Sequence, residues 1–110
     1  MTVSYFVRYE GLPADRAAFD AHYAGPHADL LRDFPGIRSL ILHGPVTAKD
    51  PYPVTDAGLH LLSQMVFDSE AALQTALDSG ARRSAFEDRA NFPTFNGTIR
   101  HQAMRAEKIF

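Results

Sequence analysis

The chain has 110 residues, of which 45% are hydrophobic and 22% are charged, which is the composition of an ordinary globular domain. Its formal net charge is -2, from 11 basic and 13 acidic residues, and no long block carries one sign. This pattern excludes a nucleic-acid-binding tail and a polybasic membrane patch. The absence of cysteine excludes disulfides, thiol nucleophiles and thiolate metal sites.

We expect a single domain, residues 1–110, located in the cytoplasm. A chain without cysteine suits a reducing compartment. Residues 1–10 contain Arg8 and Glu10 and lack an apolar stretch of signal-peptide length. No segment approaches the ~20 apolar residues that a membrane span needs. The sequence therefore predicts neither a nucleic acid nor a membrane as a partner.

The first part of the chain predicts a strand followed by an interrupted helix. Residues Val3–Tyr9 alternate β-branched and aromatic side chains, as strands do. A Gly-Leu-Pro sequence then breaks the strand, and Pro13 is well placed to open a helix. Apolar residues recur at helical spacing over Pro13–Phe34. Pro26, which follows Gly25, cannot donate a backbone hydrogen bond, so we expect a kink or two abutting helices there.

The rest of the chain predicts three more strands and a second helical region. Asp68 and Ser69 are both good N-caps for that region, and helical character resumes after Gly80. The long proline-containing loop after the second strand is typical of a lid or a contact surface. The expected segments are a strand at Ile37–Gly44, a loop at Pro45–Gly58, a strand at Leu59–Phe67, helix from Ser69 to Arg89, a loop at Asn91–Gly97 with an Asn-Gly turn, and a strand at Thr98–Lys108.

The order β-α-β-β-α-β is that of the ferredoxin-like α+β fold, with two helices on one face of a four-stranded antiparallel sheet. The first and third strands are apolar on both faces, with Phe6 opposite to Tyr5 and Val66 opposite to Met65. No further segment remains to cover the second face. We therefore expect a homodimer in which two copies pack sheet to sheet.

The first helix carries the best chemical signal, which consists of His22, Tyr23 and His27. Tyr23 and His27 are four positions apart, so on a helix one lies above the other. On a regular α-helix His27 faces the sheet, whereas His22 lies at the edge, about 140° away. An imidazole can accept and donate protons near neutral pH, and a tyrosine can polarise a carbonyl. The alternative is that His27 is a structural histidine bonded to a backbone carbonyl and that Tyr23 belongs to the core.

A metal site is not expected. His22 and His27 are five positions apart, which is poor spacing for one ion on an α-helix, and no His-Glu-x-x-His motif is present. Whether the three histidines on predicted strands converge is left open by the sequence; they are His43, His60 and His101. We expect the charged residues that follow the second helix to form a solvated face; they are Arg82, Arg83, Glu87 and Asp88.

Four segments of the chain together resemble the EthD family. Residues 19–30 read Phe-Asp-Ala-His-Tyr-Ala-Gly-Pro-His-Ala-Asp-Leu and resemble the signature of that family. Residues 35–38 are similar to its Pro-Gly-Leu-Arg start of the second strand, and residues 67–77 to its third-strand end and second helix. Residues 88–92 are similar to its Asp-x-x-Asn-Phe motif. The resemblance spans most of the chain in the same order.

The resemblance implies a dimeric α/β barrel and an activity that needs no cofactor. Methylmuconolactone isomerases similar to this family carry a Tyr-x-x-x-His pair in the first helix, which matches Tyr23 and His27. Some of them also use a tyrosine on the second strand, where this chain has Leu40.

Three functions remain open. The first is an isomerase- or lyase-type enzyme that acts on a small organic acid, lactone or aromatic compound, with His27 and Tyr23 as catalytic residues. The second is a non-catalytic accessory protein that binds a small apolar or aromatic ligand. The third is a cofactor-free monooxygenase or a haem-binding relative. The residues expected to bind the substrate are His22, Asn91, Phe92 and Phe67.

Overall fold

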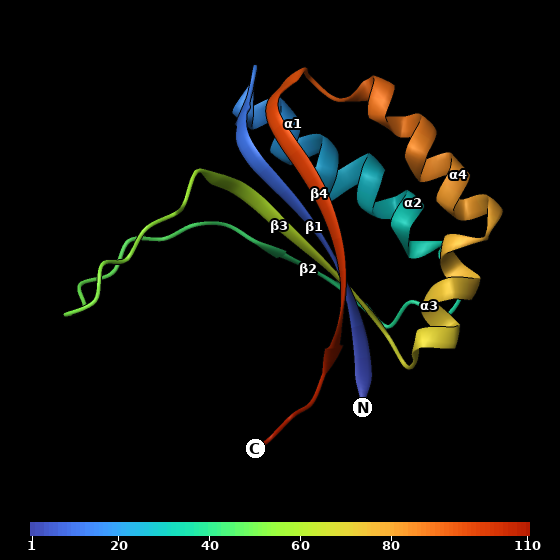
Figure 1. Cartoon of the computed structure of the whole chain (residues 1–110). Coiled ribbons are helices and arrows are strands. Elements are labelled where there is room, and N and C mark those ends of the chain that lie inside the picture. Colours follow the sequence, from blue (N-terminus) through green and yellow to red (C-terminus); the bar gives the residue numbers. More distant parts are fainter.

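The computed structural model describes residues 1–110 and shows a four-stranded antiparallel sheet with helices on one face (Figure 1). The strands are β1 (Thr2–Pro13), β2 (Ser39–His43), β3 (Leu59–Phe67) and β4 (Phe95–Ala106), in the spatial order β2-β3-β1-β4. The helical segments are α1 (Arg16–His22), η1 (Tyr23–His27), α2 (Ala28–Arg32), α3 (Glu70–Leu77), α4 (Gly80–Glu87) and η2 (Asp88–Asn91). This is the predicted ferredoxin-like arrangement.

The central strand β1 is longer than predicted, because two glycines let it continue beside β4. Gly11 lies opposite Gly97 in the ladder. A Cβ atom on Gly11 would overlap the carbonyl oxygen of Asn96, and one on Gly97 would overlap that of Glu10. The predicted Asn-Gly turn is therefore wrong, since Asn96 and Gly97 are paired residues of β4. That strand begins at Phe95 rather than at Thr98 and ends at Ala106 rather than at Lys108.

The first helix begins three residues later than Pro13 suggested. Asp15 is its N-cap and accepts a hydrogen bond from the backbone N–H of Ala18 at 3.0 Å. Pro13 instead ends β1, where it is tolerated because β3 pairs with β1 only as far as Glu10. In the second helical region, Ser69 rather than Asp68 caps α3.

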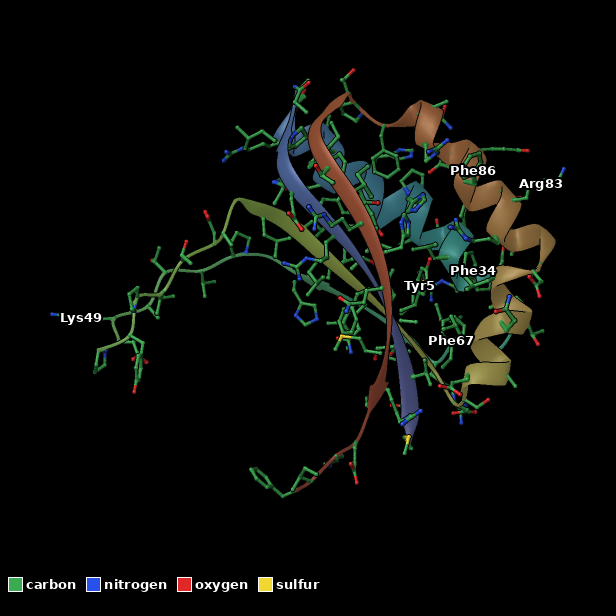
Figure 2. The ribbon with its side chains drawn as sticks, in the orientation of Figure 1. Tyr5, Phe34, Lys49, Phe67, Arg83 and Phe86 are labelled. Carbon is green, nitrogen blue, oxygen red and sulfur yellow. The ribbon has the colours of Figure 1, made fainter.

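The core lies between the sheet and the helices. Tyr5, Phe34 and Phe67 extend into this layer from the sheet and from the end of the first helical region (Figure 2). The remaining large members of the core come from alternate positions of β1 and β3 and from the inner sides of the helices. These alternate positions on the strands are the ones whose period of two predicted an inward face.

The second face of the sheet has no helix over it (Figure 1). It is apolar as predicted, and its apolar side chains are Phe6, Ile41, Leu62, Val66 and Met104. At its centre the Gln64 side chain donates to Ser4 Oγ at 3.0 Å, and Gln64 Oε1 lies 2.9 Å from His43 Nε2.

The loop between β2 and β3 projects from the body as a long arm, with Lys49 near its end (Figures 1 and 2). Every residue from Ile41 to Gly58 is exposed. No helix of the structure combines the length and apolar content needed to cross a membrane.

Candidate active site

The site is built around a single wide helical turn, η1, which joins α1 to α2. The backbone N–H of Ala28 bonds to the carbonyl of Tyr23, five residues earlier, which makes this a π-helical turn. Pro26 lies inside the turn and lacks the N–H that a regular turn would use. The predicted interruption at Gly25-Pro26 is therefore confirmed, and the helix widens there without ending.

The wide turn changes how the two histidines relate to each other. His22 Nε2 and His27 Nδ1 each lie 2.8 Å from the same atom, Oδ2 of Asp88. The expected separation of about 140° was wrong, because a turn closed between residues five apart brings positions i and i+5 side by side. Tyr23 still packs against His27, edge to face, with ring centroids 4.8 Å apart.

Asp88 is the residue at the centre of this group, although it was expected on a solvated face. It starts η2, is only 6% exposed, and accepts a third hydrogen bond from Asn91 Nδ2 at 2.8 Å. Burial alone would raise the pKa of Asp88, but the hydrogen bonds from Asn91, His27 and His22 outweigh that effect and leave the pKa below its ordinary value. Asp88 is therefore an ionised acceptor near neutral pH.

The carboxylate determines the tautomer of His27. An ionised carboxylate can only accept, so His27 Nδ1 must carry the proton in this hydrogen bond. Burial lowers the pKa of His27, and the contact with Asp88 only partly offsets it. His27 is therefore neutral near pH 7, with an unprotonated Nε2.

The Nε2 atom of His27 faces an apolar cavity of about 490 Å³ between the sheet and the helices. It has no hydrogen-bond partner in the protein. It is nevertheless not sealed in the core, because the one buried side-chain polar atom left unpaired is Ser63 Oγ. His27 Nε2 is thus reached from the cavity. The cavity volume falls in the range of small-molecule sites, about 300–1,000 Å³.

Tyr23 and Tyr9 form one wall of the cavity. Their rings meet edge to face at a centroid distance of 5.6 Å. Burial raises the pKa of Tyr23, and the nearby hydroxyls of Ser63 and Tyr9 only partly oppose that shift. Burial also raises the pKa of Tyr9, which the neighbouring Tyr23 reinforces. Both phenols are therefore protonated at neutral pH and able to donate a hydrogen bond.

The four residues expected to bind substrate fall in different places. Phe92 lines the cavity and packs against His27 at a ring-centroid distance of 5.0 Å. His22 and Asn91 do not line it and instead bind Asp88 from behind. Phe67 is fully buried in the core and does not line the cavity either.

Sequence reasoning missed the place of Asp88, Arg82, Arg89 and His101 in the site. Arg82 is half-buried at the cavity rather than on a solvated face, and His101 reaches the cavity from β4. A usable signal existed for Asp88, since the Asp-x-x-Asn-Phe motif contains its partner Asn91 and the wall residue Phe92. Spacing alone gives no sign that this motif meets the first helix.

The histidines outside the first helix do not converge. His60 lies at a bulge in β3 and binds Asp20 at 2.8 Å, whereas His43 lies on the other face of the sheet. No group of three His, Cys, Asp or Glu side chains is arranged to hold a metal ion.

The fold and the site define a class of protein. It is a ferredoxin-like α+β domain with an apolar cavity between sheet and helices, into which a carboxylate-bound histidine projects. Comparison with known proteins then identifies the family to which the chain belongs. The model of the EthD domain matches residues 12–95, and the chain belongs to the EthD family.

Known relatives agree with this assignment. An uncharacterised 11.0 kDa protein from the thcB-thcC intergenic region of Rhodococcus erythropolis is 34% identical over 87 residues, which cover 79% of this chain and 81% of the relative. The crystal structure of an EthD family protein from Bacillus halodurans matches with a TM-score of 0.77 at 26% identity, over 97% of this chain and 100% of the other. SnoaB, a cofactor-independent oxygenase from Streptomyces nogalater, matches with a TM-score of 0.64 at 16% identity, over 97% and 94%, and shows the shared fold alone.

Proposed function

We propose that this protein is a cofactor-independent enzyme of the isomerase or lyase type, in which His27 moves a proton on a small, mostly apolar ligand. The observation that carries the proposal is the state of His27, whose Nδ1 is bound to Asp88 while Nε2 faces the cavity unpaired. This is how a general base is prepared, because the carboxylate fixes the tautomer and stabilises the imidazolium that forms. Asp88 is then a positioning residue.

The proposed reaction begins at a C–H bond next to a carbonyl. His27 Nε2 removes the proton, and the electron pair passes into the carbonyl to give an enolate. A protonated Tyr23 or Tyr9 supplies the hydrogen bond that stabilises the enolate oxygen. If the next two carbons share a double bond, His27 returns the proton to the far carbon, the double bond shifts towards the carbonyl, and an isomerisation is complete. If the next carbon carries a leaving group, the carbonyl re-forms as that group departs with the proton from His27, and an elimination is complete.

A cofactor-free oxygenase is a second candidate, favoured by the fold shared with SnoaB. It would use the same first step, because removal of a proton by His27 gives a carbanion that can react with O₂. Oxygen consumption separates this candidate from isomerisation and elimination. A non-catalytic binding protein would occupy the same cavity without any exchange of the ligand's protons.

Deuterium incorporation tests the proposal. A panel of lactones, 2-enoic acids and aryl ketones would be incubated in D₂O with the protein and followed by NMR. We expect incorporation in at least one compound, and a loss of about 10²–10⁴-fold in the rate for His27→Gln. His60→Gln is the matched control, since His60 does not line the cavity. Equal rates for the protein and His27→Gln would contradict the assignment of the base.

We also propose that the protein forms a homodimer through the face of the sheet that bears no helices. The proposal is supported by the apolar side chains on that face, among them Ile41 at 43% and Met104 at 48% exposure. Monomers do not usually leave so many apolar side chains of one sheet face in water. A second copy packed face to face would bury it in both subunits.

A further inference from the structure

The polar part of the cavity lining has a single sign of charge. Nineteen residues line the cavity, 13 of them hydrophobic, and none of them is Asp or Glu. The charged and titratable nitrogen groups among them are Arg82, Arg89, His27 and His101. Asp88, the carboxylate that binds His27, is occupied by His22, His27 and Asn91 and does not line the cavity.

Arg82 is the most informative of these residues. It is half-buried on α4, yet its guanidinium forms neither an ion pair nor a hydrogen bond. A guanidinium has five N–H donors, and no protein group takes those of Arg82, so they are free to bind a ligand in the cavity that this residue lines. Its neighbour Arg83 differs, since it is exposed and points away from the sheet (Figure 2).

Arg89, an exposed residue, also lines the cavity and is held in place by Phe86. Its Nε donates to the carbonyl oxygen of Phe86 at 3.2 Å, and its Cζ lies 3.8 Å from the centroid of the Phe86 ring. These contacts fix the plane of the guanidinium and leave its terminal nitrogens without protein partners. A fixed, unpaired guanidinium is suited to bidentate recognition of a carboxylate.

The two arginines act on the same region of the cavity. Burial lowers the pKa of His101, and the charges of Arg82 and Arg89 lower it further. Arg82 also contributes to the lowered pKa of His27, after the larger effect of burial. Positive charge is therefore concentrated on the part of the lining formed by Arg82 and Arg89 near His101, in a cavity whose other lining residues are mostly apolar.

We propose that the ligand of this cavity is an apolar or aromatic carboxylate, with its anionic group held by Arg82 and Arg89 beside His101. Its apolar body lies against the aromatic wall, which brings it to His27. The inference narrows the proposed function to one class of ligand and rests on that function only for the role of His27. A neutral ligand of the same shape would leave both guanidinium groups unpaired.

A pair of nearly isosteric probes tests the inference by isothermal titration calorimetry at neutral pH. The probes are 2-naphthoate and 2-naphthalenemethanol, which share the ring system and differ in charge. We expect the protein to bind the carboxylate about tenfold more tightly than the alcohol, as charge-assisted hydrogen bonds would give. Arg82→Met should lower affinity for 2-naphthoate by about five- to tenfold and leave affinity for the alcohol unchanged, because Met retains the aliphatic stem.

Two variants act as controls. Arg83→Met removes a charge from the adjacent residue of the same helix and should leave both affinities unchanged, whereas Arg82→Lys should recover part of the preference for the carboxylate. The inference is overturned if neither probe binds, if the alcohol binds as tightly as the carboxylate, or if Arg82→Met and Arg83→Met have equal effects. His27→Gln separates this inference from the proposed function, since it keeps both arginines: the preference for the carboxylate should survive in it whether or not the protein proves to be catalytic.

Discussion

His27 and Asp88 are 61 residues apart in the sequence, and His27 Nδ1 lies 2.8 Å from Asp88 Oδ2. This contact joins the first helical region to the turn that follows α4 and fixes which nitrogen of His27 faces the cavity. The chemistry proposed here depends on that relationship, because a histidine in the other tautomer would present an N–H rather than a lone pair.

Replacement of Asp88 by Asn should weaken both the site and the fold. An amide has one acceptor oxygen, so it cannot serve His22, His27 and Asn91 together. We expect the free energy of unfolding to fall by about 1–3 kcal/mol, as for a buried donor left without its partner. Urea unfolding measures this change, and Asp33→Asn on the exposed end of α2 is the control. A loss that is equally small in both variants would show that Asp88 does not organise the site.

The lowered pKa of His27 predicts how stability depends on pH. Because the folded pKa is below the unfolded value of about 6.5, the unfolded chain takes up the proton first as pH falls. The contribution of His27 to the free energy of unfolding is therefore fully present above about pH 6.5 and declines as pH falls from there towards the folded pKa. His101, whose pKa is also lowered, acts in the same direction.

Urea unfolding at several pH values checks this dependence. His27→Gln should show a smaller loss of stability between about pH 7 and pH 5 than the unchanged protein does. An equal slope in the two proteins would mean that His27 titrates at the same pH when folded and when unfolded.

Much of this site could be predicted from local spacing, but its centre could not. The four-residue spacing of Tyr23 and His27 predicted the inward pair, because the two rings still pack edge to face within the π-helical turn. The alignment of His22 with His27 was missed because angles were taken from a regular α-helix. Asp88 was missed because its role depends on packing between distant segments, whereas its own neighbours are charged and suggested a solvated face.

In the fold, too, local patterns predicted some features, whereas others depended on contacts between distant segments. Alternation of side chains predicted β1 and β3 and both of their apolar faces, since the period of two depends only on the strand itself. The end of β1 was placed too early because Gly11 and Asn96-Gly97 were taken as local turn signals. Their function comes from the partner strand, whose backbone approaches closely enough to exclude a side chain.

Two alanine substitutions should therefore have opposite effects. Gly97→Ala places a Cβ against the Glu10 carbonyl and should lower the free energy of unfolding by about 1–3 kcal/mol through overpacking. Gly25→Ala meets no atom within 4 Å and should raise it by about 0.5–1 kcal/mol. Thermal or urea unfolding measures both. A stable Gly97→Ala variant would contradict the pairing of Gly11 with Gly97.

The proposed dimer makes a prediction that is independent of the chemistry. Ile41→Lys combined with Met104→Lys places charges on the face of the sheet without helices, at two positions that are exposed in the single chain. We expect sedimentation velocity to show a dimer for the unchanged protein and a monomer for this variant, because buried unpaired charges oppose association. Lys substitution at the exposed Val46 on the arm is the control. An unchanged sedimentation coefficient for the double variant would place the interface elsewhere.

The state of His27 is tested most directly by NMR of the ¹⁵N-labelled histidine ring as pH is varied. We predict a neutral imidazole at pH 7 with the proton on Nδ1, an unprotonated Nε2, and a pKa below the ordinary value of about 6.5. A proton on Nε2 in the neutral ring, or a pKa above that value, would contradict the assignment of His27 as the base that faces the cavity.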